Sequence, residues 1–328
     1  MTRVSTNFGK SIIGQGRIKE LLAKQLELNT ASSSYLFIGL RDLGKQKLAH
    51  EFAAALLCSD QTTVYPCGKC ESCKIWENGK DIIPDFYEVT LPSESSEIST
   101  DEIRDLKIRA SQTALGGSRK VIIVNHADKL STGAENALLK LLEEPPKNTH
   151  ILLLHNMTRP VMETIESRCQ ILRFTPPSVN EVIMWLISNG CEKSVAEEIA
   201  FVAKGRPEKA RLYLDFKETF ADAKNTVTML AEYFENPERL ISELGFNEKM
   251  SWAERQEKAR DLLESYLFIL RSALLKKLNV KTIMPFKMKI TNTDLKNIMS
   301  RIRNVENSLS LLSFSVPGNI LIEHSLYA

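Results

Sequence analysis

The sequence predicts an α/β domain built on a parallel sheet, followed by an all-α region. Three short, unbroken apolar runs, at residues 35–38, 121–124 and 151–154, are typical of strands buried on both faces of such a sheet. Segments with helical periodicity separate these runs, as expected where strands and helices alternate. From about residue 216 to the end, the pattern is helical with few β signals. The two parts of the chain are therefore expected to differ in structural class.

The composition is that of an ordinary globular protein. Its 328 residues suffice for two or three domains. The 43 basic and 41 acidic residues give a net charge of +2, which is not the balance of a protein that grips nucleic acid alone. No apolar run approaches the ~20 residues needed to cross a bilayer, and no signal-peptide-like stretch opens the sequence. We expect a cytoplasmic protein with no membrane partner.

The first predicted strand runs into the pattern G-x-x-x-x-G-K at residues 39–45, and a helical pattern follows. Strand, glycine-rich loop and helix form the context of a phosphate-binding loop. Backbone N–H groups between Gly39 and Gly44 would hold phosphates, and Lys45 would reach their oxygens. The next position should be Ser or Thr to coordinate Mg²⁺, but it is Gln46, whose amide is a poor replacement. The loop either binds phosphate without metal or is a glycine-rich turn kept for its shape.

A second position also lacks metal chemistry. The strand at 121–124 ends in Asn125 and His126, where an ATPase of this type carries acidic residues that hold Mg²⁺ and orient the attacking water. Neither residue supplies a negative charge. Together with Gln46, this leaves nucleotide binding open and argues against hydrolysis.

Four cysteines follow the helix after the phosphate loop, in the spacing C-x8-C-x2-C-x2-C. They are Cys58, Cys67, Cys70 and Cys73. Four thiolates at such intervals suit tetrahedral Zn²⁺, and a site with four protein ligands is closed and structural. An Fe–S cluster and a chance grouping of free thiols are the weaker alternatives. The two other cysteines, Cys169 and Cys191, are expected to be buried apolar residues.

Polar residues continue to mark the strand ends further along the chain. Ser131 or Thr132 caps a predicted helix that Pro145-Pro146 ends. The next strand stops at His155-Asn156, and a further apolar run spans 171–174. In open α/β sheets, ligands bind outside the carboxyl ends of the strands, so a nucleotide site would be built from these residues.

The assembled motifs resemble the AAA+ clamp-loader subunits of the bacterial DNA polymerase III holoenzyme. The resemblance covers residues 10 to 215 or so and is looser beyond. Its specific parts are the cysteine spacing, LLKLLEEPP and SRC, whereas the phosphate loop alone would not identify the family. The matching stretches are IIGQ at 12–15, YLFIG at 35–39, the phosphate loop, the four cysteines, ENALLKLLEEPP at 135–146 and TIESRC at 164–169.

The resemblance implies an architecture of three parts. Residues 1–175 would form a P-loop AAA+ nucleotide-binding-like domain with a parallel sheet and a zinc-binding insertion at 58–80. Residues 176–215 would form a small helical lid. Residues 216–328 would form the helical collar through which the subunits oligomerise.

Within the family, the chain is most similar to the delta-prime branch. The ATPase subunits, gamma and tau, keep Ser or Thr where Gln46 stands, Asp-Glu where Asn125-His126 stand, and arginine where Glu208 aligns. The resemblance therefore implies a subunit without ATPase activity of its own, in which ATP binding is doubtful. Asn156 falls at the position of the family's nucleotide sensor 1.

The resemblance gives Arg168, in the SRC motif, the role of an arginine finger supplied in trans to the ATP site of a neighbouring subunit. A guanidinium suits this role because it is always charged and its planar fork can hold two phosphate oxygens. The alternative is a surface arginine in an ion pair.

The implied partners are the gamma/tau and delta subunits, with the sliding clamp and primed DNA reached through the complex. Two other functions compete with a non-hydrolysing subunit: an ATP-hydrolysing gamma/tau-like subunit and a zinc-containing DNA-binding module. A basic cluster near residues 204–211 would approach DNA or a partner, or form a solvated face.

Overall fold

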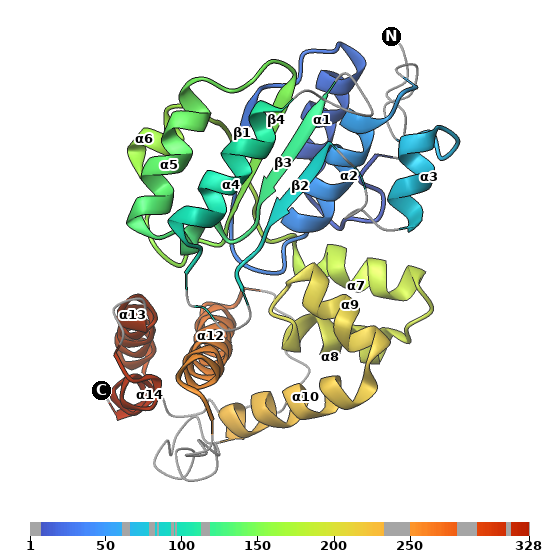
Figure 1. The fold of residues 1–328 in the computed structure, drawn as a ribbon. Coiled ribbons are helices and arrows are strands. Elements are labelled where there is room, and N and C mark those ends of the chain that lie inside the picture. The colour runs from blue at the N-terminus through green and yellow to red at the C-terminus, as the bar shows by residue number, and fades with distance from the viewer. Residues whose placement is uncertain are drawn as a thin grey trace. The chain divides into compact units, whose positions relative to one another are not determined.

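The computed structural model consists of two compact units, Met1–Pro177 and Ser178–Ala328 (Figure 1). It describes residues 8–60, 66–78, 83, 85–92, 95, 97–112, 119–232, 250–280, 294–312 and 316–327. Among these residues, no helix is both long and apolar enough to cross a membrane.

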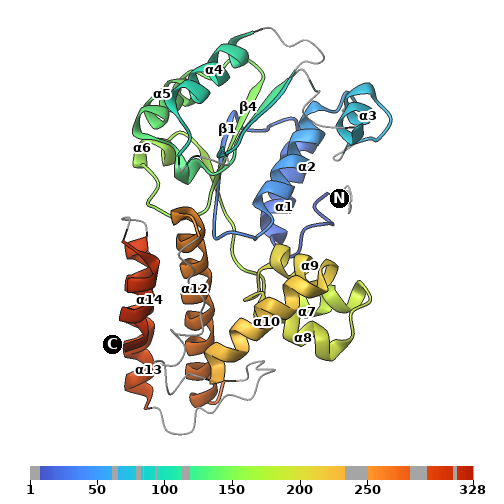
Figure 2. The same ribbon diagram turned by 60° about the horizontal axis from the view of Figure 1, so that its bottom comes forward.

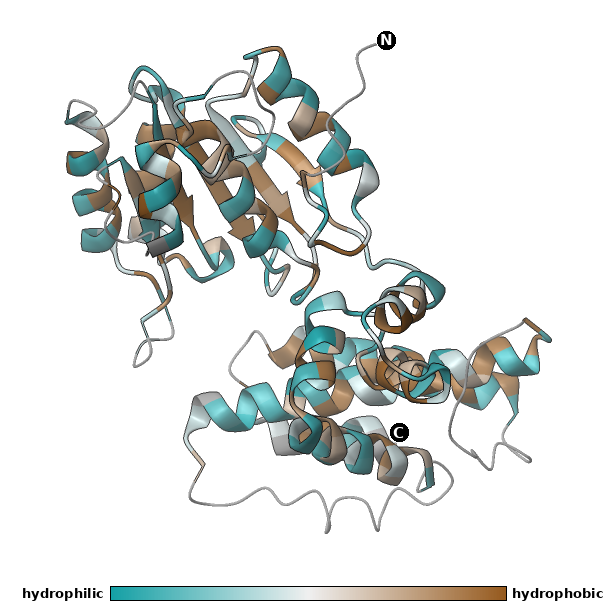
Figure 3. Cartoon of the chain, turned by 90° about the vertical axis from the view of Figure 1, so that its right-hand side faces the viewer, coloured by the Kyte–Doolittle hydropathy of each residue, from teal (hydrophilic) through white to brown (hydrophobic). Residues whose placement is uncertain are grey.

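The first unit is organised around a five-stranded parallel sheet in the order β2-β3-β4-β1-β5. Every residue of the three central strands, β3, β4 and β1, is buried, which confirms the prediction from their unbroken apolar runs. Figure 3 shows the hydrophobic colouring of the strands. The strands are β1 (Ser34–Ile38), β2 (Phe86–Val89), β3 (Lys120–Val124), β4 (Thr149–His155) and β5 (Gln170–Arg173).

Helices cover both faces of this sheet, as Figure 2 shows. Successive strand residues point to opposite faces. Tyr35 and Phe37 therefore join one core with α1 and α2, whereas Leu36 and Ile38 join another with α4 and α5. The helices are α1 (Gly16–Glu27), α2 (Lys45–Leu57), α3 (Glu71–Asn78), α4 (Thr100–Ser111), α5 (Thr132–Glu143) and α6 (Glu163–Glu166).

Several local predictions are confirmed, and others are extended. Ser131 is the N-cap of α5, its hydroxyl accepting from the Ala134 backbone N–H at 3.2 Å. The helix stops before Pro145, as expected. His155 belongs to β4 rather than following it, because it continues the pairing with Ile38 of β1. The elements β2, α3 and α4 lie outside the expectations drawn from the sequence.

The second unit contains only helices among its described residues. A capping box at Ser178 and Glu181 starts α7. Buried side chains from every described helix of this unit form one continuous hydrophobic core, so this packing does not separate a lid from a collar, and that division stays a prediction. The helices are α7 (Val179–Ser188), α8 (Lys193–Val202), α9 (Pro207–Asp215), α10 (Lys217–Glu232), α12 (Trp252–Lys277), α13 (Leu295–Leu311) and α14 (Gly318–Tyr327).

Candidate functional site

The phosphate loop joins β1 to α2, as the motif predicts. Its two glycines are required by the shape of the backbone. Gly44 caps α2 in a left-handed conformation with φ of 82°. A Cβ at Gly39 would lie 2.5 Å from the carbonyl oxygen of Phe174, which passes directly beside it. These requirements hold whether or not phosphate binds.

The lysine of the loop is turned inward. Lys45 is 5% exposed, and its ammonium donates to the carbonyl oxygen of Gly39 at 2.7 Å and to that of Leu40. Gln46 is also engaged, because its amide donates to the Glu88 carboxylate on β2 at 3.2 Å. The side chains that would contact phosphate and metal are thus bonded to the protein itself.

A polar cluster lies where β3 and β4 end. Asp128 is buried and accepts from the backbone N–H of Asn156 at 3.1 Å and from the Thr158 hydroxyl. Burial raises the pKa of Asp128, but these two hydrogen bonds, together with the interaction with His155, outweigh burial and hold the pKa below its usual value. This carboxylate, which the sequence pattern did not single out, ties the two strand ends together.

The predicted sensor position meets the residues at the end of β3. The Asn156 side-chain nitrogen lies 3.1 Å from Nδ1 of His126. Burial lowers the pKa of His126, so its imidazole is neutral near pH 7 and can accept from this amide. Asn125 uses its side-chain oxygen to accept from the His126 backbone N–H at 3.0 Å. Asn125 and His126 therefore form hydrogen bonds that serve the local structure.

The four predicted metal ligands come together. The sulfur atoms of Cys58, Cys67, Cys70 and Cys73 all lie within 4.8 Å of one another. The Cys58–Cys70 and Cys67–Cys73 sulfur pairs are each separated by 3.9 Å. Tetrahedral zinc with Zn–S bonds of ~2.3 Å places its sulfurs about 3.8 Å apart. The donor set therefore fits a tetrahedral metal ion.

Backbone N–H groups also favour thiolates in this cluster. The N–H of Cys70 donates to the Cys67 sulfur at 3.3 Å, and that of Cys73 donates to the Cys70 sulfur at 3.5 Å. Burial raises the pKa of Cys70, but hydrogen bonds from the backbone of Cys73 and Ser59 more than offset it and bring the pKa to about 6. A thiolate is the form that binds metal.

Helix α3 begins directly after Cys70, contains Cys73 and anchors the cysteine cluster to the first unit. The Trp76 ring packs edge-on against Phe86 of β2, with centroids 5.0 Å apart, and against His50 of α2 at 6.4 Å.

Cys169 and Cys191 lie outside the cluster and are only partly buried, so the expectation that they are buried is wrong.

Arg168 lies at the amino ends of the strands, whereas the phosphate loop lies at their carboxyl ends. Gln170, the first residue of β5, pairs with Tyr35 near the start of β1, whereas the loop follows the end of β1. At ~3.3 Å per residue along β1, these two ends of the sheet are about 15 Å apart. The Arg168 side chain is 34% exposed and forms an ion pair with Glu143 at 2.7 Å. From this position, Arg168 cannot serve its own phosphate loop.

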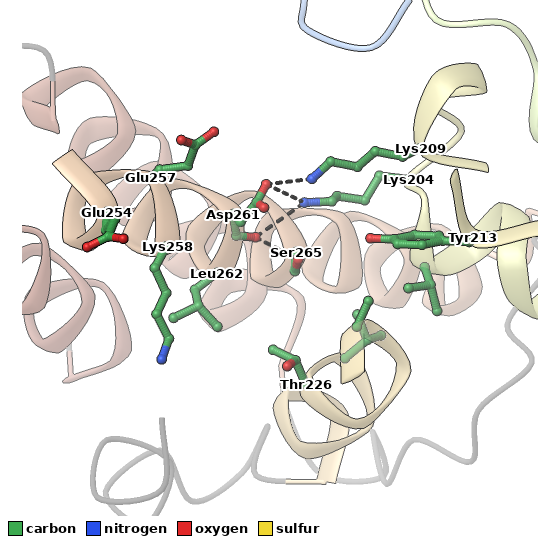
Figure 4. Close-up of a pocket in the computed structure, with 13 residues that line it drawn as sticks. Lys204, Lys209, Tyr213, Thr226, Glu254, Glu257, Lys258, Asp261, Leu262 and Ser265 are labelled. Carbon is green, nitrogen blue, oxygen red and sulfur yellow. Dashed lines mark hydrogen bonds and ion pairs between the residues drawn. The ribbon is translucent and has the colours of Figure 1, made fainter. Parts of the chain in front are cut away.

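The basic cluster of the second unit is internal, so its interpretation as a solvated or DNA-facing surface is wrong. Lys204 and Lys209 contact Asp261 of α12 at 3.7 and 2.7 Å, and Arg206 contacts Glu264 at 2.9 Å. Figure 4 shows the two lysines directed at Asp261, beside a cavity of about 420 Å³. These ion pairs join the α8–α9 connection and the first turn of α9 to α12.

Comparisons with known proteins agree with this architecture. A family model described as DNA polymerase III, delta subunit, matches residues 14–178. DNA polymerase III subunit delta' of Bacillus subtilis is 31% identical over 218 residues, which cover 66% of this chain and 64% of that protein. The chain belongs to the DNA polymerase III delta-prime family. It spans less than two thirds of the length of this relative.

Relatives outside the delta-prime branch share the same fold. DNA polymerase III subunit tau of B. subtilis is 36% identical over 165 residues, covering 50% of this chain and 28% of that protein. A gamma subunit-related protein of Thermotoga maritima superimposes with a TM-score of 0.51 at 16% identity, covering 94% of this chain and 96% of that one. The predicted α/β class, a parallel sheet with an additional helical region, is thereby confirmed.

Proposed function

We propose that this delta-prime family member is a non-hydrolysing subunit of the clamp loader that donates Arg168 to the ATP site of a neighbouring gamma/tau-type subunit. The supporting observation is the position of Arg168. Its side chain is partly exposed, and it lies at the opposite end of the strands from the chain's own phosphate loop. In the assembly, this chain, the ATPase subunits and the delta subunit act together to load the sliding clamp onto primed DNA.

The arginine acts on charge that develops in a neighbour's transition state. During ATP hydrolysis, negative charge is spread over the oxygens of the transferred phosphoryl group, and a guanidinium in contact with them stabilises this state. In well-studied NTPases such an arginine is worth roughly 10³–10⁵ in rate.

The chain's own loop is proposed to serve as structure. Lys45 is bonded to two loop carbonyls and Gln46 to Glu88. A gamma/tau-like ATPase would instead need Lys45 on phosphate and a hydroxyl and a carboxylate on Mg²⁺. Asn125 offers no charge at the strand end. ATP binding and hydrolysis are accordingly assigned to the partners.

The cysteine cluster is proposed to hold a structural zinc ion. Cys58, Cys67, Cys70 and Cys73 would supply all four ligands, which leaves no position for a catalytic water. The ion would fix the segment between α2 and α3 and keep Trp76 packed on the sheet. The zinc would therefore contribute to stability and not to chemistry.

The test is single-turnover, DNA-stimulated ATP hydrolysis by the reassembled complex of this chain with the ATPase subunit, the delta subunit, the clamp and primed DNA. We expect Arg168→Ala to slow turnover at the ATP site it serves by about 10³-fold. Arg173→Ala is the matched control, since Arg173 is an exposed arginine five residues away with only a 3.8 Å ion pair to Glu166. An unchanged rate in an intact Arg168→Ala complex would overturn the finger role.

A further inference from the structure

The guanidinium of Arg168 is held on one side only. Nη1 donates to the carbonyl oxygen of Thr164 at 2.9 Å and to the Ser167 hydroxyl at 3.2 Å. Nη2 donates to Oε1 of Glu143 at 2.7 Å. Thr164 and Ser167 are near neighbours of Arg168 in the chain, so Glu143 is the contact that comes from a different element, the last turn of α5.

These contacts leave a usable pair of donors. A guanidinium has five N–H groups, and the three bonds engage two on Nη1 and one on Nη2. The N–H on Nε and the second N–H on Nη2 have no partner among the residues that the structure describes. Two such donors can contact two oxygens of one phosphate.

We propose that Glu143 is a positioning residue that aims the unpartnered donors of Arg168 at a phosphate of the neighbouring subunit, an inference that rests on the proposed function. The α5 helix packs on the sheet through Leu138, Leu141 and Leu142, so its last residue is a fixed support. An arginine on the short α6–β5 connection, without this support, samples more side-chain rotamers and loses them only when it docks. Misplacement of a catalytic group by about 1 Å can cost roughly 100-fold in rate.

The negative charge of Glu143 acts in the opposite direction, because it partly offsets the charge that Arg168 offers to phosphate. Substitutions of similar shape separate the two effects. Glu143→Gln keeps an oxygen that accepts from Nη2 and removes the charge. Glu143→Met removes both and keeps the length of the side chain. Since Glu143 is about half exposed at a helix end, neither change disturbs the core.

The experiment measures single-turnover ATP hydrolysis by the reassembled complex. With Glu143→Met, we expect the rate at saturating ATP to fall about 10-fold at the affected site, with the half-saturating ATP concentration changed less than about twofold. Glu143→Gln should retain at least about half of the wild-type rate. Glu144→Met is the matched control, one residue further along, and should match wild type. In the Arg168→Ala background, Glu143→Met should have no further effect.

The outcomes separate this inference from the proposed function. If Arg168→Ala leaves the rate unchanged, the finger role fails, and this inference fails with it. If Arg168→Ala slows hydrolysis and Glu143→Met does not, the finger role stands and the positioning role is overturned. The same holds if the two rate effects multiply in the double variant. Faster hydrolysis by both Glu143 variants would mean that the carboxylate restrains Arg168, which also overturns it. Co-elution of each variant with the complex verifies assembly, and Glu143→Ala replaces any variant that does not assemble.

Discussion

In the phosphate loop, the groups that would bind a ligand bond to one another, whereas in the cysteine cluster they converge on a common point. Lys45 donates to the carbonyls of its own loop, and Gln46 donates to Glu88. The four cysteine sulfurs instead approach one another to within 4.8 Å. One loop therefore fits a stable turn without a ligand, and the other fits a turn that a metal ion completes.

Under the proposed function, the difference means that a nucleotide-binding fold can persist while the ATP chemistry belongs to another subunit. A phosphate loop whose glycines and lysine satisfy each other no longer depends on phosphate for its conformation. Thiols have weak hydrogen bonds and cannot replace a metal in this way. Removal of the ligand should therefore affect the cysteine cluster far more than the loop.

Metal removal is expected to give the largest effect on stability. Free zinc at 100 to 1,000 times its Kd would stabilise the folded chain by about 3–4 kcal/mol, so chelation or Cys70→Ser should lower the free energy of unfolding by about this amount. Metal analysis of the purified chain and thermal unfolding with and without a chelator provide the measurement. Cys191→Ser is the control and should keep the metal. If the purified chain contains no zinc and the chelator does not change its unfolding, the cysteine cluster does not depend on a metal ion, and the contrast with the phosphate loop is wrong.

The buried carboxylate between the strand ends should give a smaller effect. Asp128→Asn removes the charge that accepts from Asn156 and Thr158, and we expect a loss of about 1–3 kcal/mol in the free energy of unfolding. Denaturant unfolding near pH 7 measures this loss. Asp101→Asn is the control, because Asp101 is highly exposed and its ion pair with Arg104 contributes little.

The pH dependence of the same variant follows from the lowered pKa of Asp128. Since the folded pKa lies below the unfolded value of about 3.9, the ionised group stabilises the fold above that value. The contribution is lost as the pH falls through the folded pKa. The difference between wild type and Asp128→Asn should therefore be constant above about pH 7, where burial keeps the neighbouring His126 and His155 neutral, and should shrink below about pH 4. A difference that does not shrink as the pH falls below about 4 would contradict this assignment.

The central strands and the cysteine cluster could be predicted from the sequence because their signals are local. An unbroken apolar run such as 121–124 is typical of a buried strand in a parallel sheet, and four closely spaced thiols are typical of a metal site. Helix α4 had a local signal too, the capping box of Ser99 and Glu102, which would have located its start. Strand β2 offers only four residues at the sheet edge, too short for a clear period.

The contacts that define the sites depend on residues far apart in the chain. His126 and Asn156 meet because β3 and β4 are neighbours in the sheet, and Lys204 meets Asp261 only after α12 has packed. The inward turn of Lys45 depends on the loop conformation and not on its motif. A pattern of residue types gives the candidate ligands of a site, and the tertiary structure decides which of them already have partners.

Restoring the missing hydroxyl of the phosphate loop should have the smallest effect. In Gln46→Thr, Lys45 still bonds to the carbonyls of Gly39 and Leu40, and Asn125 still supplies no charge for Mg²⁺. We expect no measurable ATP turnover by the purified chain and a change of less than about 0.5 kcal/mol in the free energy of unfolding. Titration with a fluorescent ATP analogue in the presence and absence of Mg²⁺ measures binding. Magnesium-dependent tightening of ATP binding with Gln46→Thr alone would mean that Lys45 turns readily from the loop carbonyls to phosphate.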